Sequence, residues 1–198
     1  MKTCSWIAIA ILGTLLLATP GLSQPGSSPA RARHHFESPT ISFDYSYPLA
    51  LCKGAPPVCQ GCKSPSQVIA CVAYDKKIYA GYNLSEVPAL SIAILDDVHD
   101  EAKCLALSED ELTSKPKDQQ FNGVTFKTVI QEEGAMSHAY RTYFYRTFHS
   151  GRCYDLELHI ATVNIGVLDP AEHAKEFTDA DERKVVGNFT RMLNTLRL

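Results

Sequence analysis

The cysteines constrain this chain more than any other sequence feature. The 198 residues contain seven cysteines, and one of them, Cys4, lies in an N-terminal segment that we expect to be removed. An even six then remain, which in an exported chain is typical of a set of disulfides. Six cysteines allow 15 pairings, and the sequence alone does not choose among them. The six are Cys52, Cys59, Cys62, Cys71, Cys104 and Cys153.

Residues 1–23 have the three parts of a secretory signal peptide. Lys2 provides the positive start, an apolar run covers 6–18, and small residues ahead of position 24 predict cleavage after Ser23. The apolar run of about 13 residues is shorter than the ~20 that a membrane-spanning helix needs. We therefore expect a secreted or periplasmic protein that has no membrane contact after cleavage. An uncleaved membrane anchor is the alternative.

Composition divides the remaining chain into a linker and one domain. Residues 24–35 are rich in proline, serine and glycine, which predicts a flexible linker, and residues 36–198 are of the length of a single domain. The formal net charge is −3, and loss of Lys2 makes it −4. A protein that binds nucleic acid normally carries a basic stripe. The sequence shows none, so we expect no nucleic-acid partner.

Alternating apolar and polar residues predict a series of strands. The last three expected strands are joined by short turns, which predicts an antiparallel meander. The expected strands cover 40–47, 67–74, 77–82, 89–95, 124–131, 138–149 and 153–164.

Two helices are expected beside these strands. Acidic residues from Asp96 onward suit the first turn of a helix that carries Cys104, and 108–120 is expected to add one helical turn and then a loop. The second helix begins at Thr178, which with Asp181 approximates a capping box. Strands followed by a closing helix predict the α+β class.

Three segments resemble the PsbP-like superfamily. Ser42-Phe43-Asp44-Tyr45-Ser46-Tyr47-Pro48 is similar to its opening strand, with phenylalanine, three residues, tyrosine and proline, and Phe121–Phe126 is similar to its asparagine-glycine strand entry. Residues 143–154 resemble a hairpin of uncharacterised exported bacterial proteins of the same shape. The resemblance implies that 36–198 form an α/β/α sandwich, a central antiparallel sheet flanked by helices. It implies no function, because members include photosystem accessory subunits, a GTPase-binding protein and many proteins of unknown role.

Cys59 and Cys62 form a C-x-x-C motif, which suits thiol redox chemistry when the pKa of the first thiol is depressed. The motif lies among glycine and proline with no helix directly behind it, so structural disulfides among the four cysteines from Cys52 to Cys71 are favoured. A redox site and a four-cysteine zinc site remain open as alternatives. We expect no cofactor and no bound metal.

Cys104 and Cys153 lie outside that cysteine-rich loop, and we expect them to pair. Their bridge would tie the first helix to the long hairpin and close a loop of about fifty residues. In the chain-entropy model such a bridge stabilises the fold by about 3–4 kcal/mol.

Two clusters of charged residues could carry chemistry, and each has a simpler explanation. Asp96, Asp97, His99 and Asp100 have oxygen and nitrogen ligands for a cation, but acidic residues at a helix start explain them. Asp155, Glu157 and His159 share one face of a strand, where paired carboxylates could act as acid and base, but a solvated sheet face gives the same pattern. No motif of a known catalytic class is present, so no catalytic residue is predicted.

These observations favour an exported, disulfide-stabilised domain that acts without catalysis, as a binding or accessory protein. Its partner is expected to be a protein or a component of the cell envelope. The alternative is a thiol redox or metal-binding protein that uses the Cys59–Cys62 cluster.

Overall fold

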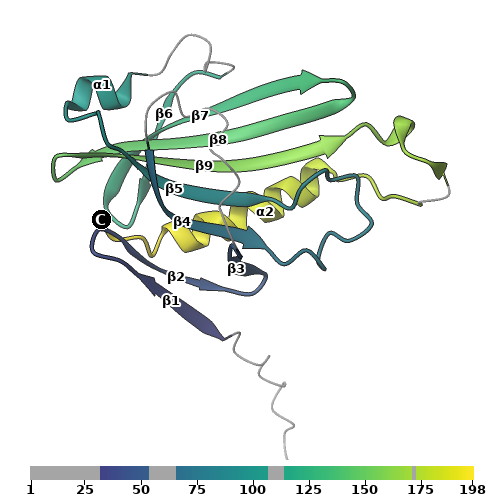
Figure 1. Ribbon diagram of the computed structural model, residues 1–198, viewed down its shortest axis with the longest axis horizontal. Helices are drawn as coiled ribbons and strands as arrows, with labels where there is room; N and C mark the ends of the chain where they lie inside the picture. Colours follow the sequence, from purple (N-terminus) through teal and green to yellow (C-terminus); the bar gives the residue numbers. More distant parts are fainter. Residues whose placement is uncertain (1–31, 54–65, 107–113, 171–172) are drawn as a thin grey trace, which may run out of the picture. The chain divides into compact units, whose positions relative to one another are not determined.

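The computed structural model describes residues 32–53, 66–106, 114–170 and 173–198. The described residues are mostly β-structure: a seven-stranded antiparallel sheet in the order β3-β4-β5-β9-β8-β7-β6, and a separate antiparallel pair β1-β2 (Figure 1). The strands are β1 Arg33–Glu37, β2 Ser42–Ser46, β3 Leu49–Leu51, β4 Ser66–Tyr74, β5 Ala89–Leu95, β6 Lys117–Phe121, β7 Val124–Ala135, β8 His138–His149 and β9 Arg152–Val163. The helices are α1 Glu101–Leu105 and α2 Asp179–Leu193, with a 3₁₀ turn η2 at Ile165–Val167.

The antiparallel meander predicted from the C-terminal half is confirmed as β7, β8 and β9. In the short turn between β8 and β9, Ser150 and Gly151 have positive φ of 50° and 75°, as a two-residue hairpin turn requires. The long strands put alternate side chains on opposite faces of the sheet, so each of the two faces has its own set of residues. We call these the helix face, against which α2 packs, and the opposite face.

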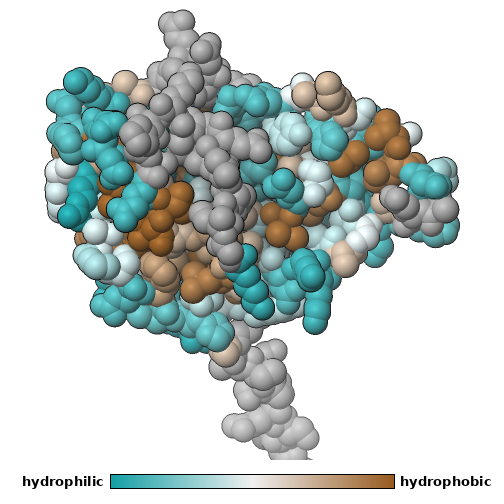
Figure 2. Space-filling view, viewed as in Figure 1, coloured by the Kyte–Doolittle hydropathy of each residue, from teal (hydrophilic) through white to brown (hydrophobic). Residues whose placement is uncertain are grey.

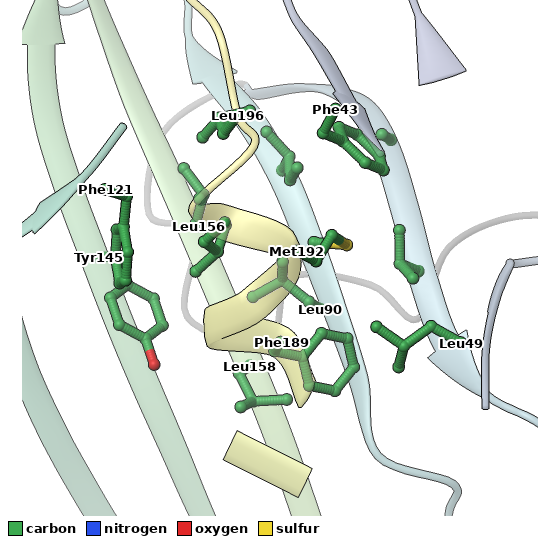
Figure 3. Close-up of a cluster of buried hydrophobic side chains, with 14 of the residues drawn as sticks. Phe43, Leu49, Leu90, Phe121, Tyr145, Leu156, Leu158, Phe189, Met192 and Leu196 are labelled. Atoms are coloured by element: carbon green, nitrogen blue, oxygen red, sulfur yellow. The ribbon is translucent and has the colours of Figure 1, made fainter. Parts of the chain in front are cut away.

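Apolar side chains fill the space between the helix face and α2. Leu90 of β5 and Leu158 of β9 are cross-strand partners and are fully buried, as is Phe189 of α2 (Figure 3). The ring of Phe189 lies 5.7 Å from that of Tyr74 on β4. This packing buries one stripe of an amphipathic helix against one face of a sheet, which is the main source of stability in such a layer.

The start of α2 confirms the predicted capping box. Thr178 accepts a hydrogen bond from the backbone N–H of Asp181, and the Asp181 carboxylate accepts one from the backbone N–H of Thr178. The two side chains satisfy backbone donors that the first turn of a helix leaves without partners.

The predicted fold class is wrong. We expected an α+β sandwich, with helices flanking a central sheet on both faces, but the described chain is mostly β and has only two helices. The expected first helix shortens to the five residues Glu101–Leu105, because Asp96 and Asp97 lie in a turn after β5 and Asp100 becomes the N-cap. Part of the segment expected to be helical turn and loop is instead the edge strand β6, which pairs with β7 through a turn at Asn122-Gly123.

The first described residues also differ from expectation. β1 begins at Arg33, so the end of the segment predicted as linker pairs with β2. The predicted strand at 77–82 is a series of turns. The β1-β2 pair is joined to the C-terminal residues, since Ser42 and Arg197 exchange backbone hydrogen bonds of 3.0 and 2.8 Å.

Candidate functional site

Two disulfides join cysteines of the described chain. One links Cys104 of α1 to Cys153 of β9, which is the pair we expected, and its Cα atoms are 5.5 Å apart. The other links Cys52, just after β3, to Cys71 of β4. Cys59 and Cys62 lie outside the described residues, so the redox alternative stays a prediction. The four-cysteine zinc site loses two of its thiolates, because Cys52 and Cys71 are bonded to each other.

Both disulfides lie on the opposite face of the sheet. Residues that pair directly across neighbouring strands lie on the same face, and so do alternate residues of one strand. The register pairs Cys71 with Ser91, Ser91 with Glu157, and Cys153 with Leu95, so both cysteines share the face of Glu157. Around Cys153 and Cys104 a second, smaller apolar cluster forms with Leu95.

Charged groups are buried between these disulfides. Arg146 of β8 lies directly across from Asp155 of β9 and donates from Nε and Nη2 to its two carboxylate oxygens, at 3.2 and 3.3 Å. The side chains are 10% and 2% exposed, and Arg146 also donates to the carbonyl of Ala106 at the end of α1, at 3.4 Å. Glu157 is buried as well, with 8% exposed. The expectation of a solvated face at Asp155 and Glu157 is therefore wrong.

His159 lies further along the same face, away from α1. Its Nδ1 is 3.1 Å from the hydroxyl of Thr142, and its ring stacks on Tyr140, whose ring stacks in turn on His138. Burial lowers the pKa of His159, against the smaller effects of the carboxylates of Glu86 and Glu133, which raise it. Asp155 and His159 therefore differ in kind. The charge of Asp155 is balanced by the arginine that pairs with it, whereas burial favours the uncharged form of His159.

One member of the other acidic cluster has a local structural role. Asp100 caps α1 by accepting a hydrogen bond from the backbone N–H of Lys103 at 2.9 Å. Within the described residues no group of three or more potential metal-ligating side chains comes together, and this covers Asp96, Asp97 and His99.

A carboxylate between α2 and β8, the middle strand of the meander, fixes how the helix lies on the sheet. Glu182 accepts hydrogen bonds from the guanidinium of Arg141, at 2.5 Å, and from the hydroxyl of Tyr143. Arg141 also pairs with Glu132 at 2.8 Å. The group is an ion-pair network between elements, and every member has a partner in it.

Two hollows open on the described surface. The larger, of about 360 Å³, lies where α1 meets the β6-β7 turn and is lined by Leu105, Phe148 and the paired Asp118 and Lys127, together with His149. The smaller, of about 160 Å³, lies between β2 and α2. Its lining brings together Arg33, Asp44, Tyr47, Asn188 and Arg191, along with Tyr45, Ser46, Leu49, Met192 and Thr195.

Large apolar side chains are exposed at one end of the sheet. Met136 in the β7-β8 turn is 96% exposed, and Ile165 and Val167 of η2 are 41% and 58% exposed. A backbone hydrogen bond of 2.7 Å from Asn164 to Ser137 holds the two turns together. Figure 2 shows hydrophobic residues gathered at the end where Figure 1 places this hairpin and η2. Among the described helices none is long and apolar enough to cross a membrane.

No protein-family model matches the chain, and no curated protein matches it. A crystal structure from Bacteroides thetaiotaomicron VPI-5482 is similar at 9% identity and a TM-score of 0.47, over 82% of this chain and 47% of that one. LpqN, involved in cell envelope biogenesis of Mycobacterium tuberculosis, is similar at 11% identity and a TM-score of 0.44, over 83% of this chain and 89% of that one. The chain spans about half the length of the first structure. Neither is described as PsbP-like, so that resemblance stays a prediction, and likenesses this distant carry no argument about function.

The residues of the smaller hollow escaped sequence analysis. Arg33 lies in the segment we expected to be linker, and Arg191 lies on the closing helix, so the two are far apart along the chain. The spacing of Asn188 and Arg191, three residues apart on one helix face, was the available signal, but the same spacing occurs on any solvated helix.

Proposed function

We propose that this protein is an exported, disulfide-stabilised binding or accessory domain that acts without catalysis on a protein or a component of the cell envelope. The observation that carries the proposal is the placement of the two disulfides. Each joins a short element, the end of the edge strand β3 or the helix α1, to a longer strand of the sheet, which is a bracing role. Such bonds persist in oxidising compartments, so they are consistent with an extracellular or envelope location.

The proposed domain has hollows and exposed apolar residues through which it can bind. Two of the charged residues considered for chemistry are engaged in structural contacts: Asp155, an acid-base candidate, with Arg146, and Asp100, a candidate cation ligand, with the start of α1. The signal peptide over 1–23 and the linker that follows remain part of the proposal.

Disulfide mapping by mass spectrometry of the purified native protein, without reduction, tests the proposal. We expect Cys52–Cys71, Cys104–Cys153 and a third bond Cys59–Cys62, with no free thiol and resistance to mild reductant. A Cys59–Cys62 bond that mild reductant opens selectively, releasing a thiol of low pKa, contradicts the proposal and supports the redox alternative.

Fractionation of cells that express the full chain, or the chain without residues 1–23, tests export separately.

A further inference from the structure

The smaller hollow holds an arginine that has no acidic partner in the part of the chain that the structure describes. Arg191 of α2 lines this hollow, and its guanidinium donates to the side-chain carbonyl of Asn188. Among the described residues no carboxylate lies within ion-pair distance of Arg191. Since guanidinium groups form their strongest hydrogen bonds with carboxylates and phosphates, the unused donors of Arg191 define a place for an anion.

A chain of hydrogen bonds fixes Arg191 in this position. The amide nitrogen of Asn188 donates to the hydroxyl of Tyr74, and that hydroxyl donates to the carbonyl of Lys184 at 3.2 Å. Asn188 therefore uses its amide nitrogen on the sheet and its oxygen on Arg191. Tyr74 is buried, so this chain anchors the guanidinium to the core and reduces the entropy that a flexible arginine loses on binding.

The charges that line the hollow match a ligand of one negative charge. Arg33 and Arg191 are positive, and Asp44 is negative, which leaves a net charge of +1. Asp44 is already held by His35, with Nδ1 at 2.7 Å from its carboxylate, and by Arg33 at 3.9 Å. A carboxylate balances the remaining charge, whereas the double charge of a phosphate monoester exceeds it and is repelled by Asp44.

The size and the other walls of the hollow describe the rest of the ligand. Its volume of about 160 Å³ exceeds the ~10–15 Å³ that one water needs but falls below the ~300 Å³ at which pockets for drug-sized ligands begin. The ring of Tyr47, 52% exposed, lies in its lining together with Leu49 and Met192, and these offer apolar contact beside the charge. We propose that the hollow between β2 and α2 binds a monocarboxylate, with the carboxylate on Arg191 and an apolar group against Tyr47.

This inference rests on the proposed binding function and names the ligand class of one site. Benzoate is the probe, and benzamide, which has nearly the same shape without the charge, is its control. Titration of the disulfide-intact protein is followed by amide NMR shifts at residues that line the hollow. We expect saturable shifts with benzoate, at about millimolar dissociation constant for so small a ligand, and at least about tenfold weaker binding of benzamide.

Two variants on the same helix locate the site. Arg191→Gln is expected to weaken benzoate binding about tenfold or more, and Arg183→Gln, an exposed position that does not line the hollow, is expected to leave it unchanged. Arg191→Lys should fall between them, because lysine keeps the charge but loses the planar fork. Thermal unfolding shows that each variant is folded.

Three results would overturn the inference. They are equal binding of benzoate and benzamide, equal losses in Arg191→Gln and Arg183→Gln, and tighter binding of inorganic phosphate than of benzoate at the same ionic strength. The disulfide map is measured independently of this titration. An absence of benzoate binding with three stable disulfides rejects only this site, while a labile Cys59–Cys62 bond rejects the proposed function whatever benzoate does.

Discussion

The two faces of the seven-stranded sheet are stabilised by different means. On the helix face, α2 packs its apolar stripe against residues such as Leu90 and Leu158. The helix also contacts this face through Glu182, which accepts hydrogen bonds from Arg141 and Tyr143. On the opposite face, the buried side chains include Arg146, Asp155 and Glu157, and both disulfides lie there. A long helix covers the first face, while α1, the described helix that packs near the second, has only five residues.

The difference shows what a short covering element requires. A helix of five residues buries little apolar area, so packing alone holds it weakly. Here α1 is fixed instead by the Cys104–Cys153 bond and by the hydrogen bond from Arg146 to the carbonyl of Ala106. We infer that covalent and charged links replace apolar area on the opposite face, and each prediction below tests one face against the other.

The largest effect is expected on the helix face. Phe189→Ala removes a fully buried ring from the contact between α2 and β4 and should lower the free energy of unfolding by about 3–5 kcal/mol, since the space refills only partly. Guanidinium denaturation of the oxidised protein measures it. The matched control Arg183→Ala, at an exposed position of the same helix, should change stability by less than about 0.5 kcal/mol. A loss below about 1 kcal/mol for Phe189→Ala would show that α2 is not the main support of this face.

Nearly as large an effect is expected from the disulfide of the opposite face. Replacement of both Cys104 and Cys153 by alanine should cost about 3–4 kcal/mol, because the bond closes a loop with a sequence separation of 49. Replacement of Cys52 and Cys71, separated by 19, should cost about 3 kcal/mol. Urea denaturation of both double variants gives the two values. If neither loss exceeds about 1 kcal/mol, the disulfides do not replace apolar area on this face.

Much of the helix face, but little of the opposite face, could be predicted from sequence. The alternation in 153–164 and the capping box at Thr178 are local patterns, and they gave β9 and the start of α2 correctly. The burial of Asp155 is not local, because it depends on a register that places Arg146 across from it. An alternating strand shows which residues share a face, but it does not show whether the polar face is covered. For the same reason β6, polar and at the sheet edge, was taken for a loop.

The buried ion pair comes next in expected size. Arg146→Met leaves the carboxylate of Asp155 buried without its arginine, which should cost about 3 kcal/mol. The double variant Arg146→Met with Asp155→Leu removes both charges and should recover most of that loss, because well-packed apolar residues can replace a buried pair. Chemical denaturation of the wild type, the two single variants and the double variant gives the coupling. A double variant as unstable as the sum of the singles would mean that the pair is not coupled.

A smaller effect is expected at the start of α2. Thr178→Ala removes a cap and should cost about 1 kcal/mol, while Thr178→Ser keeps the hydroxyl and serves as the control. The hydrogen bond from Thr178 is the largest cause of the lowered pKa of Asp181. A carboxylate with a lowered pKa stabilises the fold above its unfolded pKa, near 4, and this is lost as pH falls through the folded pKa. Thermal unfolding at pH 7 and pH 3 should therefore show a smaller gap between wild type and Thr178→Ala at the lower pH.

The smallest effect is expected from His159 on the opposite face, and it should appear in the mildly acidic pH range. Burial lowers its pKa, although the carboxylates of Glu86 and Glu133 act the other way, and its neighbours Thr142 and Tyr140 are uncharged. The unfolded chain then binds a proton more readily than the folded one, so stability is complete above about pH 6.5 and declines as pH falls from there through the folded pKa.

His159→Gln should flatten the part of the stability-against-pH curve between pH 7 and pH 5, measured by urea denaturation, whereas His173→Gln, at an exposed position, should leave its slope unchanged. Equal slopes in the wild type and His159→Gln would show that the opposite face tolerates a proton at this position. Burial of a titratable ring would then no longer distinguish the opposite face from the helix face. The contrast between the two faces would rest on the ion pair and the disulfides alone.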